Sequence, residues 1–513
     1  MASKRVKSSV ILMFISVFSG IIISLLGISK MRLFLVCYGA DLNALYQILF
    51  QLVSYLSIVD LGIAPVFTAQ FYKVVSEENQ EKTISLYKGC IFCQRLVIIL
   101  MIILMVILYT YIILFQSNSF LSKFQMLLSF SLLALPVIAQ KTLVANYAYC
   151  DALQEKHKYE GYYQFFEIIR TCFNILIISH VTFIYYLLYD CAIEIFIIFL
   201  MKCITNKSKK QLFKSLKNDV EKDISPLKNT LAITTNQLCD QGINNTDYQL
   251  ASQYYTYSQI SVLSIYKYVV NIIMSFAIQI LYSTKNAFGN LFSLEGNYHE
   301  HIVEAFNEFV IFISCFIGVM TFIGIDPIIS LISTGSDLQY GITYLNRYFL
   351  VLWMVIRIVN IPLKIYSEAR GTFRQLMLGK IFELIISLVL MLICLKVFGL
   401  FGVFIASIIS KLSVEGFNYC KAYHDVDYYW VYLKRIILMI IVLTLSEFSL
   451  TIILFKLNLE LNTLFSWIVS MSVLSIPCLL ILIVLCYVLF ENFRIQSKVI
   501  VYGIVKLMKG AKK

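Results

Sequence analysis

The chain has 513 residues, of which 59% are hydrophobic and 14% are charged. Because soluble domains carry about 25% charged residues, this composition excludes a soluble globular protein and indicates a polytopic membrane protein. The formal net charge of +12 does not indicate a nucleic-acid partner, since the Lys and Arg residues lie in short segments between apolar runs, where membrane topology accounts for them.

A membrane-spanning helix needs about 20 mostly apolar residues, and by this measure the sequence predicts an all-α protein with about fourteen spans. Six spans come first, at residues 10–29, 44–67, 86–115, 124–149, 164–181 and 184–201. The others follow at 227–244, 255–282, 303–325, 340–365, 379–397, 400–420, 436–455 and 464–489. The first span lacks a small-residue cleavage site, so we expect a retained helix and not a signal peptide.

Lys and Arg residues gather in the segments that follow even-numbered spans. Segments after odd-numbered spans contain few of them, and 116–122, 245–254 and 326–339 contain none. The exceptions are Lys30 and Arg32 after the first span, together with Lys396 and Lys456. Because cytoplasmic loops of membrane proteins are enriched in Lys and Arg, we expect both termini to lie in the cytoplasm.

The longest polar interruption is the stretch 202–228, which contains eight lysines and ends near Pro226. We expect a basic cytoplasmic hinge loop that contacts anionic headgroups. It divides the chain into four parts: an N-terminal six-helix bundle at 1–201, the hinge loop at 202–226, a C-terminal six-helix bundle at 227–420, and an extra helical hairpin with a basic cytoplasmic tail at 421–513.

Short motifs recur in the two halves at a nearly constant offset. Tyr149-Cys150-Asp151-Ala152 returns as Tyr366-Ser367-Glu368-Ala369, 217 residues later, and Ser76-Glu77-Glu78 returns as Ser293-Leu294-Glu295. A third motif is Phe166-Glu167-Ile168-Ile169, repeated at Phe382-Glu383-Leu384-Ile385 with an offset of 216. Six helices per copy is an even number, so we expect two parallel bundles, an arrangement typical of transporters.

At this point the sequence shows a resemblance. Tyr38-Gly39-Ala40-Asp41 and the following Tyr55–Gly62 segment, with its Asp-Leu-Gly, resemble the opening of bacterial polysaccharide-biosynthesis export proteins. These are the Wzx-type lipid-linked oligosaccharide flippases of the multidrug/oligosaccharidyl-lipid/polysaccharide exporter superfamily. The basic central loop, the Gly399-x-x-Gly402 turn and the final hairpin extend the similarity over the whole chain.

The resemblance implies a flippase of the bacterial plasma membrane. It would move an undecaprenyl-diphosphate-linked oligosaccharide to the outer leaflet by alternating access, for O-antigen or capsule biosynthesis. Membrane lipids would be its partners, with a polymerase and other polysaccharide-assembly proteins. A cation-coupled multidrug exporter of the same fold and a polytopic polymerase or glycosyltransferase are the alternatives, although the latter would need a large external loop that is absent between the predicted spans.

Ionisable groups inside apolar spans are costly and therefore are candidates for function. The candidates for binding the lipid diphosphate are Lys267, Arg347, Arg357, Arg95 and Arg32. Arg offers bidentate hydrogen bonds to phosphate and Lys a point charge. The alternative for each is an internal ion pair or a side chain that reaches the headgroups. We expect at least two of Lys267, Arg347 and Arg357 to face a central cavity.

Acidic residues within the spans have their own alternatives. Asp60 either binds a coupling ion or caps a helix break before Gly62. Asp190 and Glu194, four residues apart, share a helix face. Asp240, Glu415 and Glu447 are isolated along the sequence, and we expect most of these acids to be paired within the bundle.

Other chemistry has little support in the sequence. Cys90 and Cys93 have the spacing of half a metal site, but no second pair completes it. We find no Walker loop, dinucleotide fingerprint or nucleophile elbow. The sequence therefore predicts a non-enzymatic protein without a cofactor or metal.

Overall fold

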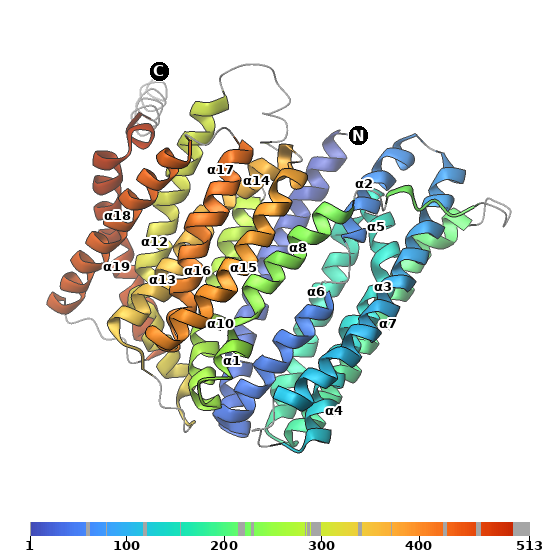
Figure 1. Ribbon diagram of the computed structural model, residues 1–513, viewed down its shortest axis with the longest axis horizontal. Coiled ribbons are helices and arrows are strands. Elements are labelled where there is room, and N and C mark those ends of the chain that lie inside the picture. Colours follow the sequence, from blue (N-terminus) through green and yellow to red (C-terminus); the bar gives the residue numbers. More distant parts are fainter. Residues whose placement is uncertain are drawn as a thin grey trace, which may run out of the picture. The chain divides into compact units, whose positions relative to one another are not determined.

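The computed structural model describes residues 2–57, 62–77, 79–115, 121–153, 155–213, 221–226, 230–282, 284, 288, 299–336, 341–370, 372–423, 428–457 and 463–495. Within these ranges the chain is almost entirely helical and contains no strand, as the ribbons in Figure 1 show. Asp60, the Ser293-Leu294-Glu295 motif, the middle of the hinge and the basic tail after residue 495 lie outside the described residues.

The helices fall into two compact units. The first unit comprises Met1–Val262 with Gly335–Leu338, and the second comprises Leu263–Thr334 with Gln339–Lys513. The expected division at the hinge differs from this clustering, because residues 230–262 group with the first unit. Whether 10–201 and 227–420 superpose as two like-oriented copies stays a prediction.

The first unit contains nine labelled helices and the start of a tenth. They are α1 (Ala2–Leu56), α2 (Ile63–Ser76), α3 (Gln80–Phe115), α4 (Lys123–Gln140), α5 (Val144–Ala152), α6 (Lys156–Ile178), α7 (Phe183–Phe213), α8 (Thr230–Asn245) and α9 (Asp247–Ala251).

The second unit contains the rest of α10 (Tyr257–Tyr282) and the helices that follow it. They are α12 (His299–Ser333), α13 (Tyr344–Val359), α14 (Ile361–Arg370), α15 (Phe373–Val397), α16 (Gly402–Ser410), α17 (Gly416–Tyr423), α18 (Tyr428–Lys456) and α19 (Leu464–Leu489). The turn Lys411–Glu415 between α16 and α17 is π-helical.

Each of the fourteen predicted spans overlaps one of these helices or a consecutive pair. Nine described helical stretches are long and apolar enough to cross a membrane. The prediction of an all-α polytopic fold is therefore confirmed. The junction between the predicted spans 164–181 and 184–201 lies between α6 and α7, and the turn that begins at Gly399 lies between α15 and α16.

The first two spans differ from the prediction at their junction. We expected a loop containing Lys30 and Arg32, whereas both residues lie inside α1, which runs to a kink at Gly39 and continues to Leu56. No Gly or Pro lies between Gly27 and Gly39 to end the helix. Gly39 has φ 81° and ψ 171°, a conformation that favours glycine. The predicted break before α2 is present, because Gly62 adopts a left-handed conformation there.

The start of the hinge also differs from the prediction, because α7 continues through residues 202–213 as helix. No Gly or Pro interrupts that stretch, and its Lys, Gln and Leu residues are good helix formers. Farther on, residues 221–226 lie against α3. The Asp223 amide donates to the Ser85 carbonyl at 3.1 Å, and the Ser85 hydroxyl donates to the Glu221 carbonyl at 2.6 Å.

Hydrogen bonds join the part of α1 after the Gly39 kink to α8 and α9, and we call this set of bonds the polar seam. The Gln51 amide donates to Asp247 Oδ1 at 2.6 Å and its carbonyl accepts from the Tyr248 amide at 3.2 Å. Gln249 donates to the Ile48 carbonyl at 3.2 Å, and Tyr55 donates to the Asn245 carbonyl at 3.1 Å. These buried hydrogen bonds explain why α8 and α9 group with the first unit.

Candidate functional site

The first group of charged side chains, the amino-terminal ion cluster, consists of Glu167, Arg170, Asp190 and Glu194. Arg170 of α6 forms a bidentate pair with Asp190 of α7, at 2.7 and 3.0 Å. The same guanidinium lies 2.9 Å from Glu194 and 3.2 Å from Glu167. Arg170 therefore satisfies three carboxylates, and the predicted pairing of Asp190 and Glu194 within the bundle is confirmed.

Two polar atoms beside this cluster have no hydrogen-bond partner among the described residues: Asn174 Oδ1 and the Tyr186 hydroxyl. Asn174 donates to Asp190 at 2.7 Å through its amide nitrogen. Lys30 of α1 lies over the Tyr186 ring at 5.7 Å. Arg170 and Lys30 thus supply two positive charges near three carboxylates, and the cluster joins α1, α6 and α7.

The second group, the carboxy-terminal ion cluster, consists of Lys380, Glu383, Lys411 and Glu415. Lys380 of α15 lies 2.9 Å from Glu383 and 2.8 Å from Glu415. Lys411 lies 3.1 Å from Glu415 and 3.7 Å from Glu383. All four side chains are at most 8% exposed, so two cations and two anions neutralise one another in the interior.

Asn360 connects this second cluster to the extra hairpin. It lies between α13 and α14, donates to Glu415 at 3.2 Å and accepts from the Tyr432 hydroxyl of α18 at 2.8 Å. Lys411 and Glu415 belong to the π-helical turn. Such turns are frequent at functional sites, and here the turn brings both side chains to α15.

The two clusters occupy related positions in the sequence repeat. Glu167 and Glu383 are the acidic residues of the motif repeated at an offset of 216. Each lies on the helix that precedes the tight turn of its half. The first cluster joins α6 to α7, and the second joins α15 to the π-helical turn after α16.

A third network contains one predicted headgroup ligand. Arg347 of α13 pairs with Asp326 of α12 at 2.9 Å, and the Tyr266 hydroxyl of α10 donates to the same carboxylate at 2.8 Å. The Arg347 guanidinium also lies over the rings of Phe322 and Tyr344, at 4.9 and 5.9 Å. Its Nε has no partner among the described residues, so Arg347 retains a donor for another acceptor.

Two more of the five cations predicted to bind the headgroup, Lys267 and Arg357, are also in the second unit. Lys267 follows Tyr266 on α10 and is buried, with 6% of its surface exposed. Arg357 lies in the last turn of α13, whereas Arg347 lies in its first turn. The Arg357 guanidinium stacks over the Trp353 ring at 4.9 Å. Lys267 therefore follows a member of the Tyr266–Asp326–Arg347 network in sequence, and Arg357 lies farther along α13.

Arg32 and Arg95 are exposed residues of α1 and α3, respectively. They belong to neither ion cluster. Asp60 lies outside the described residues, so its role as ion ligand or helix cap stays a prediction.

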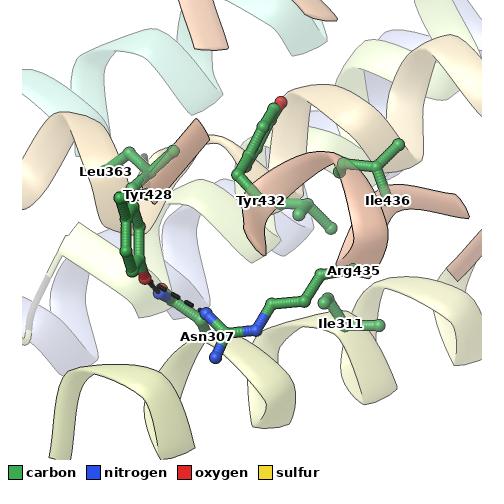
Figure 2. A pocket seen from close by; sticks show the side chains of 8 residues that line it. Asn307, Ile311, Leu363, Tyr428, Tyr432, Arg435 and Ile436 are labelled. Atoms are coloured by element: carbon green, nitrogen blue, oxygen red, sulfur yellow. Dashed lines mark hydrogen bonds between the residues drawn. The ribbon is translucent and has the colours of Figure 1, made fainter. Parts of the chain in front are cut away.

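A small, partly open pocket lies among α12, α13, α14 and α18. Figure 2 shows Asn307, Tyr428 and Arg435 facing one another in it. Arg435 donates to the Tyr428 hydroxyl at 3.1 Å and pairs with Glu304 at 3.1 Å. Because its charge is already neutralised, Arg435 is better suited to holding α18 on α12 than to binding an anion.

The sequence alone did not single out Arg170, Lys380 and Lys411. A local signal for them exists, because Glu167–Arg170 and Lys380–Glu383 are three residues apart and Lys411–Glu415 four apart on helices. Across the described ranges, no group of three or more His, Cys, Asp and Glu residues is arranged to hold a metal ion.

In the part of the chain that the structure describes, these features define an all-helical polytopic protein with clusters of paired charges between its helices. Among solved structures, the lipid II flippase MurJ in an inward closed conformation aligns with a TM-score of 0.64 at 14% identity, over 93% of this chain and 99% of MurJ. An inward-facing multidrug resistance MATE family transporter of the MOP superfamily aligns with a TM-score of 0.52 at 12% identity, over 85% of this chain and 99% of that one.

A mutant of the Vibrio cholerae MATE transporter VcmN aligns with a TM-score of 0.51 at 15% identity, over 83% of this chain and 100% of that one. No family model and no curated protein sequence matches the chain. At these identities the likeness establishes the fold, which this chain shares with MurJ and the MATE transporters.

Proposed function

We propose that the chain is a Wzx-type flippase of the bacterial plasma membrane, with both termini in the cytoplasm. It moves an undecaprenyl-diphosphate-linked oligosaccharide to the outer leaflet by alternating access, for assembly of a surface polysaccharide such as O-antigen or capsule. The observation that carries this proposal is the likeness to MurJ, whose structure is called a lipid II flippase, over nearly the full length of both chains.

Chain length favours a flippase over a drug exporter. The two MATE alignments include 99% and 100% of the MATE chains but only 85% and 83% of this chain. The MurJ alignment includes 93% of this chain. This chain is therefore longer than the MATE transporters and closer in length to MurJ. A drug exporter is the second candidate, because the MATE alignments still reach TM-scores of 0.52 and 0.51.

Lys267, Arg347 and Arg357 are the proposed headgroup ligands. A diphosphate that leaves water needs compensating charge, because an uncompensated ion in a low-dielectric medium costs of order 20 kcal/mol by Born solvation. Arg347 has an unused donor at Nε, and its ion pair with Asp326 is partly exposed, at 21% and 32%. Asp326 can therefore hold Arg347 in place until a phosphate replaces it.

The test is a flipping assay in vesicles that contain the full chain. A fluorescent undecaprenyl-diphosphate-linked oligosaccharide is added to one leaflet, and its transfer is followed by loss of access to a membrane-impermeant quencher. A charge-assisted hydrogen bond contributes about 1.5 to 3 kcal/mol, so Lys267→Ala, Arg347→Ala and Arg357→Ala should each slow flipping by about tenfold or more.

Arg374→Ala is the matched control, because Arg374 is an exposed arginine at the start of α15; it should flip at the wild-type rate. Arg347→Lys keeps the charge and loses the bidentate geometry, so it should retain partial activity. If the wild-type protein exports a cationic dye but does not flip the labelled lipid, the flippase proposal is wrong and the drug exporter takes its place. Normal flipping by all three Ala variants would remove these residues from the site.

A further inference from the structure

Glu447 is a buried carboxyl group that the proposed headgroup site does not use. It lies on α18, with 1% of its surface exposed. Its Oε1 has no hydrogen-bond partner within the described ranges. The other isolated acid of this unit, Glu415, is held by two lysines. Glu447 is thus an exception to the expected pairing of acids within the bundle.

The surroundings of Glu447 come from the helices packed on α18, which are α12, α17 and α19, and from α13. The ionisable groups that interact with it electrostatically are Cys315 of α12 and Tyr344, Tyr348 and Arg347 of α13. Cys478 and Cys486 of α19 lie around Cys315. From α17, Cys420 lies by Arg435 and not by Glu447. Within the described ranges, Arg347 is therefore the charged group whose field acts on this carboxyl.

An ionised carboxylate buried without a partner is costly, and such a group takes up a proton instead. A hard metal cation is a poor alternative occupant, because it needs six or more oxygen ligands, whereas the ionisable neighbours of Glu447 are one thiol, two phenols and a guanidinium. The chemistry of the site therefore favours a proton.

Arg347 provides a means of releasing that proton. In this structure it pairs with Asp326 at 2.9 Å, and Asp326 is 32% exposed. Its Nε is buried and lacks a partner. If the guanidinium turns from Asp326 toward Glu447, the positive charge stabilises the carboxylate, the carboxyl O–H bond breaks, and the proton leaves to water along the exposed side of the Arg347–Asp326 pair.

We propose that Glu447 is a proton-binding site, protonated while Arg347 pairs with Asp326 and deprotonated when Arg347 pairs with Glu447. Its link to transport rests on the proposed function, because a phosphate that binds Arg347 competes with both carboxylates. The extra hairpin would then contribute an ion-coupling group and not only a support for the second unit.

Infrared difference spectroscopy of the full chain in lipid nanodiscs tests the site without any substrate. The wild-type spectrum minus the Glu447→Gln spectrum should contain the C=O stretch of a protonated carboxylic acid, which shifts in D2O. Glu304→Gln, which removes an ionised acid paired with Arg435, should leave that band in place. Circular dichroism and gel filtration verify that each variant is folded.

Asp326→Asn is the second, independent arm. It frees Arg347 to pair with Glu447, so the protonated band should fall to less than half of its wild-type intensity. Absence of the band in the wild type would overturn the proton site. A band that is unchanged in Asp326→Asn would overturn the exchange of Arg347 between the two acids.

A third measurement separates this proposal from the flippase. In the vesicle assay, an imposed pH gradient should accelerate flipping by the wild type and have no effect on Glu447→Gln. Flipping that ignores the gradient in the wild type would overturn the coupling but leave the flippase intact. If both spectroscopic tests give the expected carboxyl band but the labelled lipid is not flipped, the proton site stands and the flippase proposal is wrong.

Discussion

Gly89 shows how one residue without a side chain fixes the path of a long segment. The chain at 221–226 crosses α3 at this position, where a Cβ atom on Gly89 would lie 1.8 Å from the carbonyl oxygen of Asp223. Lys222 stacks over the Phe92 ring at 3.8 Å one turn farther on. Only a glycine permits this approach, so this end of the basic hinge is attached to α3.

We expect Gly89→Ala to detach residues 221–226 from α3, because backbone atoms must move to accommodate even one methyl group. Amide hydrogen exchange at Asp223, whose amide donates to Ser85, should become faster. Gly161→Ala is the control: its Cβ would meet Ile15 at 3.6 Å, an ordinary contact. Equal exchange in both variants would show that the segment is not held at Gly89.

The carboxy-terminal ion cluster permits a sharper prediction about stability. Glu415→Gln leaves Lys380 and Lys411 facing Glu383 alone, so one buried positive charge is uncompensated. Removing one partner of a buried ion pair costs about 3 to 5 kcal/mol, and thermal unfolding in detergent should occur at a clearly lower temperature. Adding Lys411→Met restores neutrality and should recover part of the loss. A double variant less stable than Glu415→Gln would contradict this.

The sequence indicated that charged residues within the spans matter but not which of them interact. Arg170 was overlooked because its partners Asp190 and Glu194 belong to the next helix, and a pairing across helices depends on packing that one chain segment does not reveal. The ion pair between Lys380 and Glu415 likewise joins two different helical segments and depends on their packing. Arg347 could be identified from its place in an apolar run, whereas its partner Asp326 falls just beyond the predicted span 303–325.

At the scale of helices, apolar length predicted where helices lie, because a membrane requires about 20 apolar residues per crossing, although nine described stretches, and not fourteen, are long and apolar enough to cross one. The junctions were harder to predict. Gly39 bends α1 without a loop, and nothing in the preceding residues shows which glycine will adopt a positive φ. Asn360, between α13 and α14, becomes intelligible only with its partners Glu415 and Tyr432.

The polar seam between α1 and α9 gives a prediction for these elements. Gln51→Leu removes the amide that donates to Asp247 and the carbonyl that accepts from Tyr248. A buried polar group that loses its partner costs about 1 to 3 kcal/mol, so amide exchange within 247–251 should be faster. Phe50→Leu is the control, because Phe50 is the exposed neighbour of Gln51. Unchanged exchange in Gln51→Leu would mean that apolar packing alone holds α9.

For the whole molecule, the sequence repeat bears on how the chain is divided, and the charge pattern bears on how the chain is oriented in the membrane. Glu167 and Glu383, the acidic residues of the repeated Phe-Glu motif, both belong to ion clusters, whereas the superposition of the two halves stays a prediction. The motif could not show where the compact units divide, because residues 230–262 group with the first unit through hydrogen bonds to α1. Such contacts between distant segments are set by packing and not by sequence period.

The charge pattern also predicts the orientation of the whole chain, which labelling can test. Cys203 is exposed and lies at the start of the lysine-rich stretch 202–228. Ser122 is exposed and lies in the segment 116–122, which contains no Lys or Arg. In a Cys37→Ser/Cys172→Ser background, which removes the other exposed cysteines, a membrane-impermeant maleimide should label Cys203 in inside-out vesicles and not in intact cells. With Cys203 also changed to Ser, Ser122→Cys should show the reverse. The reason is the retention of Lys and Arg on the cytoplasmic side during insertion; labelling of Cys203 from outside would invert the orientation and place the hinge and both termini outside the cell.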